Sequence, residues 1–494
     1  MAGINVRHVQ EGLTSSQPGE GQQTGWFQDR VRQSTEGLGA IDAERDLSEA
    51  IDTVYRARNL VRLKLSGINV EEERLIPLAD DSLRNVPKLP LDESLIKGVA
   101  KRLFESARRV PGGRLMIAGN KRNIQIMEEI ARLCIAGGTE FGIDIVSDEL
   151  EAALVNGATD EGLEALGKEY CDFYWEYPAR AEARGNPDPD IKFNPDRLTA
   201  LSKQKIPFIR RLQAGEMHYC LTIVPTPADA SLDGLDYEAY MKLFFEACDQ
   251  PWNKIEEAQE KLVERFDAGK KVHITNEDGT DLIIDIEGMT FVNSVTLKNV
   301  PGSEVFSAPV KEGVNGKLVS KGKFKYENYS IIEDITLEFE NGRVVAFDAR
   351  VGRDILEKII TADDGRGEGT RFAGEFAVGT NPGLRRHSLN GLLVEKIGGS
   401  FHLALGSCYS YKTYNGKPVK LDNGNVSGGG IHWDLTTMLS GNNGEMELDG
   451  KVIQVNGIWV DEAGNPDESL SVLNEGWAAL PEGERPEWFK KEGA

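Results

Sequence analysis

"GRLMIAG" at residues 113–119 starts a strand–helix–strand pattern that decides the fold of the first half of the chain. This short apolar run is typical of a buried strand. It is followed by "NIQIMEEIARLCIAGG" at 123–138, which has helical periodicity and ends in glycines, and by a second apolar run, "EFGIDIVSD", at 140–148. Strands joined through a helix usually lie parallel in one sheet, so the pattern predicts an α/β domain with a mainly parallel sheet.

The same alternation continues downstream of this unit. Helical periodicity at 196–215 is followed by an apolar run at 217–226 and by a long helical stretch at 237–269. We therefore predict that residues 91–270 form the α/β domain. Residues 1–90 are expected to form a mobile polar arm, rich in Gly, Gln and Ser up to residue 38, and then a helical extension.

Beyond residue 270 the pattern changes to hairpins. Segments 270–286, 334–349 and 444–457 each join two alternating apolar runs across Asp-Gly or Asn-Gly. These dipeptides favour the tight turns of antiparallel hairpins. The sequence therefore predicts that residues 271–494 form a mainly antiparallel, β-rich (α+β) domain.

Length and composition narrow the class of protein. The 494 residues exceed what one compact domain usually holds, and the net charge of −23, from 80 acidic and 57 basic residues, is spread along the chain. Such acidity argues against nucleic acid or an anionic membrane as the main partner. The five cysteines are scattered, and the N-terminus lacks the apolar run of a secretory signal, so we expect a cytoplasmic protein without a membrane span.

Two of the six histidines lie in predicted strands of the β-rich part. His402 lies within "SFHLALG", and His432 precedes Asp434 by two positions in "IHWDL". Residues two apart in a strand point to the same face of the sheet. An H-x-D pattern alone is a weak signal, since a single such pair is more often structural.

Three glutamates of the same part stand in apolar segments. They are Glu304 in "NVPGSEVFSAP", Glu375 in "RFAGEFAVGTN" and Glu395 in "GLLVEKIGGSFHLALG". A carboxylate in apolar surroundings is costly unless it is paired or coordinated. Two histidines with up to four carboxylates suit a pair of divalent metals, which can activate a bridging water for amide hydrolysis. The alternative is a set of separately solvated side chains on hairpin turns, and spacing alone leaves both possibilities open.

Other catalytic motifs are weaker. The sequence has no G-x-x-x-x-G-K-[ST] loop and no G-x-S-x-G elbow. The segment "GGRLMIAGNKRN" lacks the full G-x-G-x-x-G fingerprint, so a packing turn is favoured over a nucleotide site. Cys408 is a conceivable nucleophile, but a buried structural thiol is the better interpretation.

An ordered series of segments resembles the thermophilic-type metallo-aminopeptidases represented by aminopeptidase T and aminopeptidase S. The resemblance covers roughly residues 110–460. After "GRLMIAG" it continues through "IVPTPADA", "QPWNKIEEAQEKL", "GTDLIIDI", "NVPGSEVFSAP", "FAGEFAVGTN", "VEKIGGSFHLALGSCY" and "GGIHWDL". One such segment would mean little, whereas the series in this order is specific.

The resemblance implies a metal site and roles for its residues. The matching metal ligands are Glu304, Glu375, Glu395, His402, His432 and Asp434. Glu375 is implied as the bridging, catalytic carboxylate, and Glu395 as a ligand or a support for other ligands. Tyr409 matches a site tyrosine placed to hydrogen-bond a metal-bound oxygen or the tetrahedral intermediate. Val394 stands where an aspartate is common, and glycines 428–430 look like a small insertion that lets the backbone turn tightly into the site.

The function that the resemblance implies is a metal-dependent aminopeptidase. It would hydrolyse N-terminal residues from peptides with two divalent ions (zinc, cobalt or manganese) and act as a homodimer. Some relatives of this fold resemble mononuclear iron dioxygenases that open hydroxylated pyridine rings, for which His402, His432 and Asp434 would suffice. A non-catalytic relative that kept the fold is the third possibility. The presence of Glu304 and Glu375 favours the dinuclear peptidase, and metal stoichiometry distinguishes the alternatives.

Overall fold

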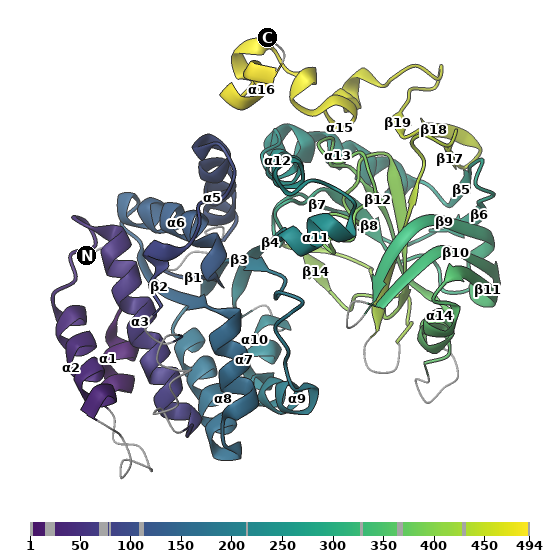
Figure 1. The fold of residues 1–494 in the computed structure, drawn as a ribbon. Coiled ribbons are helices and arrows are strands. Elements are labelled where there is room, and N and C mark those ends of the chain that lie inside the picture. Colours follow the sequence, from purple (N-terminus) through teal and green to yellow (C-terminus); the bar gives the residue numbers. More distant parts are fainter. Residues whose placement is uncertain are drawn as a thin grey trace. The chain divides into compact units, whose positions relative to one another are not determined.

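The computed structural model describes residues 3–14, 25–68, 78, 81–107, 113–213, 216–326, 330–362, 369–426 and 431–492. Its contacts divide the chain into two compact units, residues 1–242 and 243–494 (Figure 1). Residues 15–24 of the expected polar arm and the three glycines 428–430 lie outside the described residues. No helix of the described ranges has the length and apolar character needed to cross a membrane.

The first unit is built on a parallel sheet, which confirms the prediction. Within its described residues the sheet has four strands in the order β2-β1-β3-β4. The strands are β1 (Arg114–Asn120), β2 (Glu140–Val146), β3 (Ala179–Gly185) and β4 (His218–Val224). They are connected by α6 (Ile124–Ala136), α7 (Asp148–Gly157), α8 (Asp160–Trp175), α9 (Pro195–Gln204) and α10 (Ile206–Gln213).

The N-terminal segment differs from the mobile arm expected from its composition. It contains α1 (Arg7–Thr14) and α2 (Gly25–Gly39), followed by α3 (Leu47–Ser66). Val9 and Leu13, one helical turn apart, are buried in a cluster with Val54 and Val61 of α3. The few apolar residues among many polar ones thus form a stripe that packs. The Asp46 side chain caps α3 by accepting a hydrogen bond from the Glu49 amide, 3.1 Å away.

The remaining helices of the first unit are α5 (Glu93–Ala107) and α11 (Pro227–Leu232). The helix α12 (Tyr237–Cys248) then crosses from residues of the first unit to those of the second. The second unit also contains α13 (Trp252–Ala268), α14 (Arg353–Ile360), α15 (Ser471–Glu475) and α16 (Glu487–Glu492).

The second unit consists mainly of antiparallel sheets, as predicted. Its described strands form an eight-stranded sheet, β11-β10-β9-β6-β5-β17-β18-β19, a five-stranded sheet, β16-β13-β12-β8-β7, and the pair β14-β15. The larger sheet contains β5 (Lys271–Thr275), β6 (Asp281–Asp285), β9 (Val314–Tyr326), β10 (Ser330–Glu340), β11 (Arg343–Val351), β17 (Glu445–Leu448), β18 (Lys451–Val455) and β19 (Ile458–Trp459). The others are β7 (Val292–Ser294), β8 (Glu304–Ser307), β12 (Ala373–Gly379), β13 (Ser400–Gly406), β14 (Thr413–Tyr414), β15 (Lys417–Pro418) and β16 (His432–Met438).

The hairpin turns form where the dipeptides predicted them. Between β10 and β11, Asn341 and Gly342 have φ angles of 49° and 78°. Between β17 and β18, Asp449 and Gly450 have φ angles of 52° and 79°. Two successive residues with positive φ give the backbone twist that suits paired antiparallel strands.

One helix belongs with the β-rich part rather than with the parallel sheet. The predicted α/β domain ended at residue 270 and therefore included α13, but the contacts place this helix in the second unit. Its buried residues Ile255, Leu262 and Phe266 share a hydrophobic core with Val305 and Phe376 of the five-stranded sheet. The apolar stripe of α13 thus covers the strands that follow it in sequence. The three-part division drawn from the sequence stays a prediction.

Candidate metal centre

The register of the five-stranded sheet places the candidate ligands on one face. Asp434 of β16 lies opposite Ala404 of β13, which lies opposite Glu375 of β12. His402 and His432 are each two residues away from members of this row, so their side chains leave the same face. The alternation that makes a strand therefore also brings these side chains together.

Glu304 completes the face from β8. It pairs with Gly379 of β12, four residues beyond Glu375. The residues paired with the two histidines have small side chains or none: Ala377 lies opposite His402, and Gly406 lies opposite His432. Small side chains at these positions leave room above the sheet for the longer carboxylates and imidazoles.

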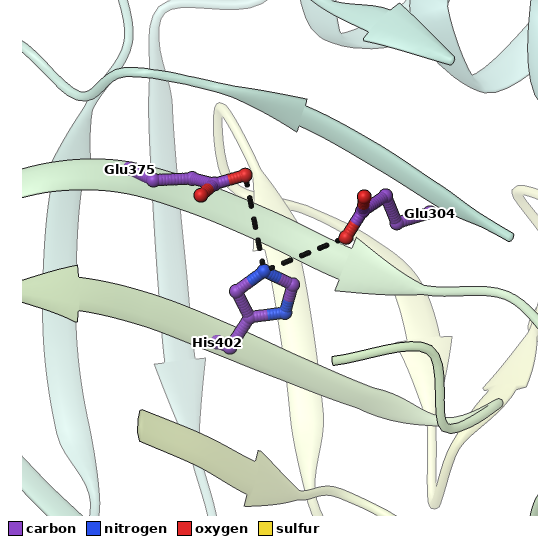
Figure 2. A group of neighbouring side chains, drawn as sticks. All are labelled: Glu304, Glu375 and His402. Atoms are coloured by element: carbon purple, nitrogen blue, oxygen red, sulfur yellow. Dashed lines mark ion pairs between the residues drawn. The ribbon is translucent and has the colours of Figure 1, made fainter. Parts of the chain in front are cut away.

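The ligand atoms form two groups that share one residue. Glu304, Glu375 and His402 form the first group, and Glu375, His432 and Asp434 form the second; within each group, one ligand atom per residue lies within 4.8 Å of the others. Figure 2 shows the first group: His402 Nε2 is 3.7 Å from Glu304 Oε2 and 3.9 Å from Glu375 Oε1. In the second group, His432 Nε2 is 2.9 Å from Glu375 Oε2 and 3.7 Å from Asp434 Oδ1. Glu375 thus presents one oxygen to each histidine.

Burial and charge shift the pKa values of these groups strongly. Burial alone would lower the pKa of the histidines, but the Glu375 carboxylate outweighs it and raises the pKa of His402 to about 9 and of His432 to about 10. Burial raises the pKa of Asp434 to about 8. The two histidines overcome burial at Glu375 and hold the pKa of its carboxyl well below its usual range. The site therefore demands positive charge at neutral pH.

The hydrogen bonds of His432 test whether a metal ion fits. Its Nδ1 lies 2.7 Å from the Ser407 carbonyl oxygen, while its Nε2 faces Glu375 at 2.9 Å. A neutral imidazole has one N–H, so it can donate to only one of these acceptors. Either a second proton or a cation must stand between Nε2 and the carboxylate. Asp434 Oδ1 is also buried and has no hydrogen-bond partner among the described residues. The set of imidazole nitrogens and carboxylate oxygens fits zinc, cobalt or manganese.

Lys396 is a residue of the site that the sequence reasoning missed. Its side chain is only 2% exposed, and its Nζ lies 2.5 Å from Glu304 Oε1 and 2.8 Å from Glu395 Oε2. Burial would lower the pKa of Lys396, but the two carboxylates outweigh it and raise the pKa. Lysine is almost never buried unless it is paired, so its position between Glu395 and the apolar "IGGSF" was the available signal.

Glu395 lies outside both ligand groups. The ammonium of Lys396 accounts for one of its oxygens and lowers the pKa of its carboxyl against the effect of burial. The geometry matches a residue that supports Glu304 through Lys396 better than one that binds a metal. A direct ligand role for Glu395 remains a prediction.

Tyr409 belongs to an aromatic wall beside the second group. Its ring centroid is 5.1 Å from that of His432, 5.4 Å from that of Phe306 and 5.5 Å from that of Tyr411. Burial, and then the negative charge of Glu375, raise the pKa of Tyr409 well above its usual value. The phenol therefore keeps its proton at neutral pH and can donate a hydrogen bond.

Cys408 shows the features of a structural thiol. Its Sγ lies 3.3 Å from Asp422 Oδ1, to which it donates a hydrogen bond. Burial raises the pKa of the Cys408 thiol, whereas a nucleophilic cysteine needs its pKa lowered. This agrees with the structural interpretation of Cys408.

The backbone around the ligands is held by close packing and by one buried amide. A Cβ on Gly374 would lie 2.4 Å from the Ser407 carbonyl oxygen, so only glycine fits before Glu375. On the other side, Gln259 of α13 donates from Nε2 to the Glu304 carbonyl oxygen at 3.3 Å and to Thr380 Oγ1 at 2.8 Å. One side chain thus ties the start of β8 to the end of β12.

Comparison with protein families and curated proteins shows what the chain is similar to. A sequence model of the family described as thermophilic metalloprotease (M29) matches residues 96–457. Aminopeptidase AmpS of Bacillus subtilis (strain 168) is 36% identical over 155 residues, which cover 29% of this chain and 36% of the relative. Aminopeptidase 2 of Geobacillus stearothermophilus is 33% identical over 144 residues, or 28% of this chain and 33% of the relative. Each match thus spans about a third of the relative's length.

One solved structure supports the fold, and a second one aligns more weakly. Wild-type AmpT from Thermus thermophilus aligns with a TM-score of 0.57 and 21% identity, over 75% of this chain and 100% of the AmpT chain. A 2,5-dihydroxypyridine dioxygenase from Pseudomonas putida KT2440 aligns with a TM-score of 0.43 and 13% identity, over 76% of this chain and 100% of that chain. The second similarity is too weak to bear on function.

Proposed function

The chain belongs to the thermophilic metalloprotease (M29) family, and from this membership we propose that it is a metal-dependent aminopeptidase that removes N-terminal residues from peptides. The observation that carries the proposal is Glu375, whose two oxygens face two different histidines in two ligand groups. A mononuclear site of two histidines and one carboxylate would not need this shared glutamate or Glu304. The curated relatives, both named aminopeptidases, point to the same reaction class.

In this proposal two divalent ions are held by the two ligand groups. Glu304 and His402 would hold one, His432 and Asp434 would hold the other, and Glu375 would be shared by both. When bound, the ions would supply a water of lowered pKa and polarise the scissile carbonyl. The donor set is compatible with zinc, cobalt or manganese.

The chain's own residues supply the remaining functions. The Tyr409 phenol, which keeps its proton, donates to the oxygen on which negative charge develops. Glu375 stays ionised at neutral pH, because the two histidines hold the pKa of its carboxyl well below its usual range, so it would offset the charge of the two ions rather than take up a proton. Lys396 holds Glu304 through an ammonium contact and keeps that carboxylate oriented.

The first experiment measures metal content per chain by elemental analysis, with hydrolysis of aminoacyl p-nitroanilides as the activity readout. The wild type and Glu375→Gln are purified without chelator, and Glu340→Gln, on the exposed end of β10, is the matched control. We expect about two ions per wild-type chain, fewer in Glu375→Gln, and activity only in the wild type and the control. A single iron that Glu375→Gln leaves unchanged would favour the ring-cleaving dioxygenase. Absence of metal and of peptidase activity after reconstitution would favour a non-catalytic relative.

The proposal also includes a homodimer that acts on peptides, as the resemblance implies, and a cytoplasmic location, as expected from the scattered cysteines and the N-terminal sequence. Light scattering coupled to size-exclusion chromatography should give twice the mass of one chain. A mass equal to one chain, at the protein concentration used for the activity assay, would contradict the homodimer.

A further inference from the structure

A pocket of about 300 Å³ lies within the first unit, away from the candidate metal centre in the sequence. Its lining includes Gly119 and Asn120 at the end of β1, Val146 at the end of β2 and Gly185 at the end of β3. The chain steps from β1 to β2 on one side and then passes back across β1 to β3. Right-handed connections in opposite directions lie on opposite faces, so the carboxyl ends of these strands form a switch point, where open parallel sheets bind ligands.

The floor of this pocket is charged, which is unusual for a parallel sheet covered by helices. Asp144 of β2, Ala118 of β1 and Glu182 of β3 lie side by side in register, and Arg180 is two residues before Glu182. Asp144, Arg180 and Glu182 are all buried. Strands in such sheets are normally apolar on both faces, and buried charges are expensive. A floor of this kind indicates a binding site rather than a packed core.

The β3 side of the pocket has unused positive charge. Glu182 is contacted by Arg180 and lies 2.8 Å from Arg184 Nε, so two guanidinium groups share one carboxylate. The buried Nε of Arg180 has no hydrogen-bond partner among the described residues. Lys205 also lines the pocket; its Nζ lies 4.4 Å from the centroid of the Tyr170 ring, and it forms no ion pair within the described residues.

The β2 side has unused negative charge. Asp148 and Glu151 of α7, which follows β2 directly, both line the pocket. Asp148 is paired with Arg122 Nη2 at 2.9 Å and accepts from Asn120 Nδ2 at 2.7 Å. Glu151 forms no ion pair within the described residues. The pocket therefore offers Glu151 together with cationic groups on Lys205 and Arg180, while Arg62, which also lines it, is held by Asp144.

The volume of the pocket limits the size of the ligand. About 300 Å³ lined by charged groups of both signs suits a small molecule that carries an ammonium and a carboxylate, such as an amino acid or a dipeptide. Leu150, Leu154 and Leu201 offer apolar contact for its side chain.

We propose that this pocket binds a small zwitterion of the α-amino-acid class, with its ammonium at Glu151 and its carboxylate at Lys205 and Arg180. The ligand would pair with Glu151 and Lys205, which form no ion pair within the described residues, and with the Nε of Arg180, which has no hydrogen-bond partner there. The site is formed by the first unit alone and does not depend on the function proposed for the metal centre.

The test is binding of L-amino acids to the full chain, first by thermal shift with the twenty common amino acids and then by calorimetry with the tightest. The amide and the deaminated analogue of that amino acid remove its carboxylate and its ammonium in turn. All titrations are repeated with chelator present and with Glu375→Gln, so that binding at the metal centre is recognised. The variants are Lys205→Gln and Glu151→Gln, with Lys203→Gln, an exposed lysine of α9, as the matched control and Lys205→Arg as the conservative change.

We expect binding that persists with chelator and in Glu375→Gln. Each analogue and each of Lys205→Gln and Glu151→Gln should bind at least about tenfold more weakly, a loss of about 1.4 kcal/mol. Lys203→Gln and Lys205→Arg should bind like the wild type. Absence of binding by every amino acid, binding abolished by chelator, or binding unchanged in both Lys205→Gln and Glu151→Gln would each overturn the proposal. Circular dichroism of each variant shows whether its fold is retained.

Discussion

The two units bury ionisable groups in opposite ways. Under the parallel sheet, Asp144 accepts from Arg58 Nε at 3.2 Å and from the Tyr174 hydroxyl at 2.8 Å, so its charge is balanced by the chain itself. The candidate metal centre has four buried or half-buried carboxylates, which are Glu304, Glu375, Glu395 and Asp434. Among the described residues of this site the one permanent cation is Lys396, which contacts Glu304 and Glu395. The Asp144 carboxylate is satisfied by the chain's own donors, whereas the group around Glu375 needs protons or metal ions.

The largest effect should come from breaking the internal balance of the first unit. Arg58→Met removes the buried guanidinium that contacts both Asp144 and Glu169, and leaves Asp144 paired with Arg62. Removal of one partner from a buried ion pair costs about 3–5 kcal/mol. Chemical denaturation should show that loss for the transition of the first unit, with the metal content unchanged. Arg132→Met, which removes exposed i,i+3 and i,i+4 contacts of α6, should change stability by less than about 1 kcal/mol. Equal losses for the two variants would contradict the conclusion that the buried charges around Asp144 are balanced by Arg58.

Tyr409→Phe tests catalysis without disturbing the charges of the second unit. The change removes one hydroxyl next to the aromatic wall and leaves the ligand carboxylates in place. Loss of one donor to a developing oxyanion typically lowers kcat about 10²–10³-fold. We expect that loss in kcat, with KM and metal content close to the wild type. Tyr411→Phe, on the neighbouring ring, is the matched control, and a similar loss there would show that Tyr409 acts only through packing.

Glu395→Gln distinguishes a supporting residue from a metal ligand. The amide keeps its shape but loses the ion pair with Lys396. Substitution of a residue that contacts a metal ligand, without binding the metal itself, typically weakens metal affinity about 10–100-fold. We expect two ions at saturating metal, with affinity weakened to that extent as measured by competition with a chelator. Loss of one ion at saturation would instead make Glu395 a direct ligand.

A further difference is a pH dependence of stability that should be strongest in the metal-free second unit. In the folded chain the pKa values of His402, His432 and Asp434 are raised to about 9, 10 and 8, so the native state binds protons more tightly than the unfolded state does. Stability from these groups is present at low pH and is lost as pH rises through the raised values. The melting temperature of the metal-free second unit should therefore fall between pH 6.5 and 10. The decline should be smaller in the metal-loaded protein, because bound cations replace the protons; a flat metal-free profile by calorimetry would contradict the assignment.

The sequence predicted the fold where its local signals agreed with the final structure. "GRLMIAG" formed a parallel strand, and Asp449-Gly450 formed its turn, because apolar periodicity and positive φ are local properties. The strand β3, "ARAEARG", was not predicted. Its charged residues alternate with alanine, which is a poor strand former, so the segment lacks the large apolar residues that indicate a strand. The charged pocket floor that these residues help to form was therefore not predicted.

The candidate site was predicted from residue types and resemblance, and the sheet register supplied what spacing could not. His432 and Asp434 share a face by simple alternation, but their approach to Glu375 depends on the pairing of β16 with β13 and of β13 with β12. Lys396 was overlooked because a lysine in a sequence is usually solvated, and only tertiary structure shows it between two buried carboxylates.

The position of Glu375 also has a consequence for how the proposed centre fills. One carboxylate oxygen faces His402 and the other faces His432, so a cation captured on either side orients the side chain for the second and at the same time withdraws negative charge from it. These two influences have opposite signs, and linkage requires that each ion alters the affinity of the other by the same factor. If the proposed centre takes two ions, its loading would therefore be a coupled equilibrium, and the abundance of the singly filled protein would report which influence is larger.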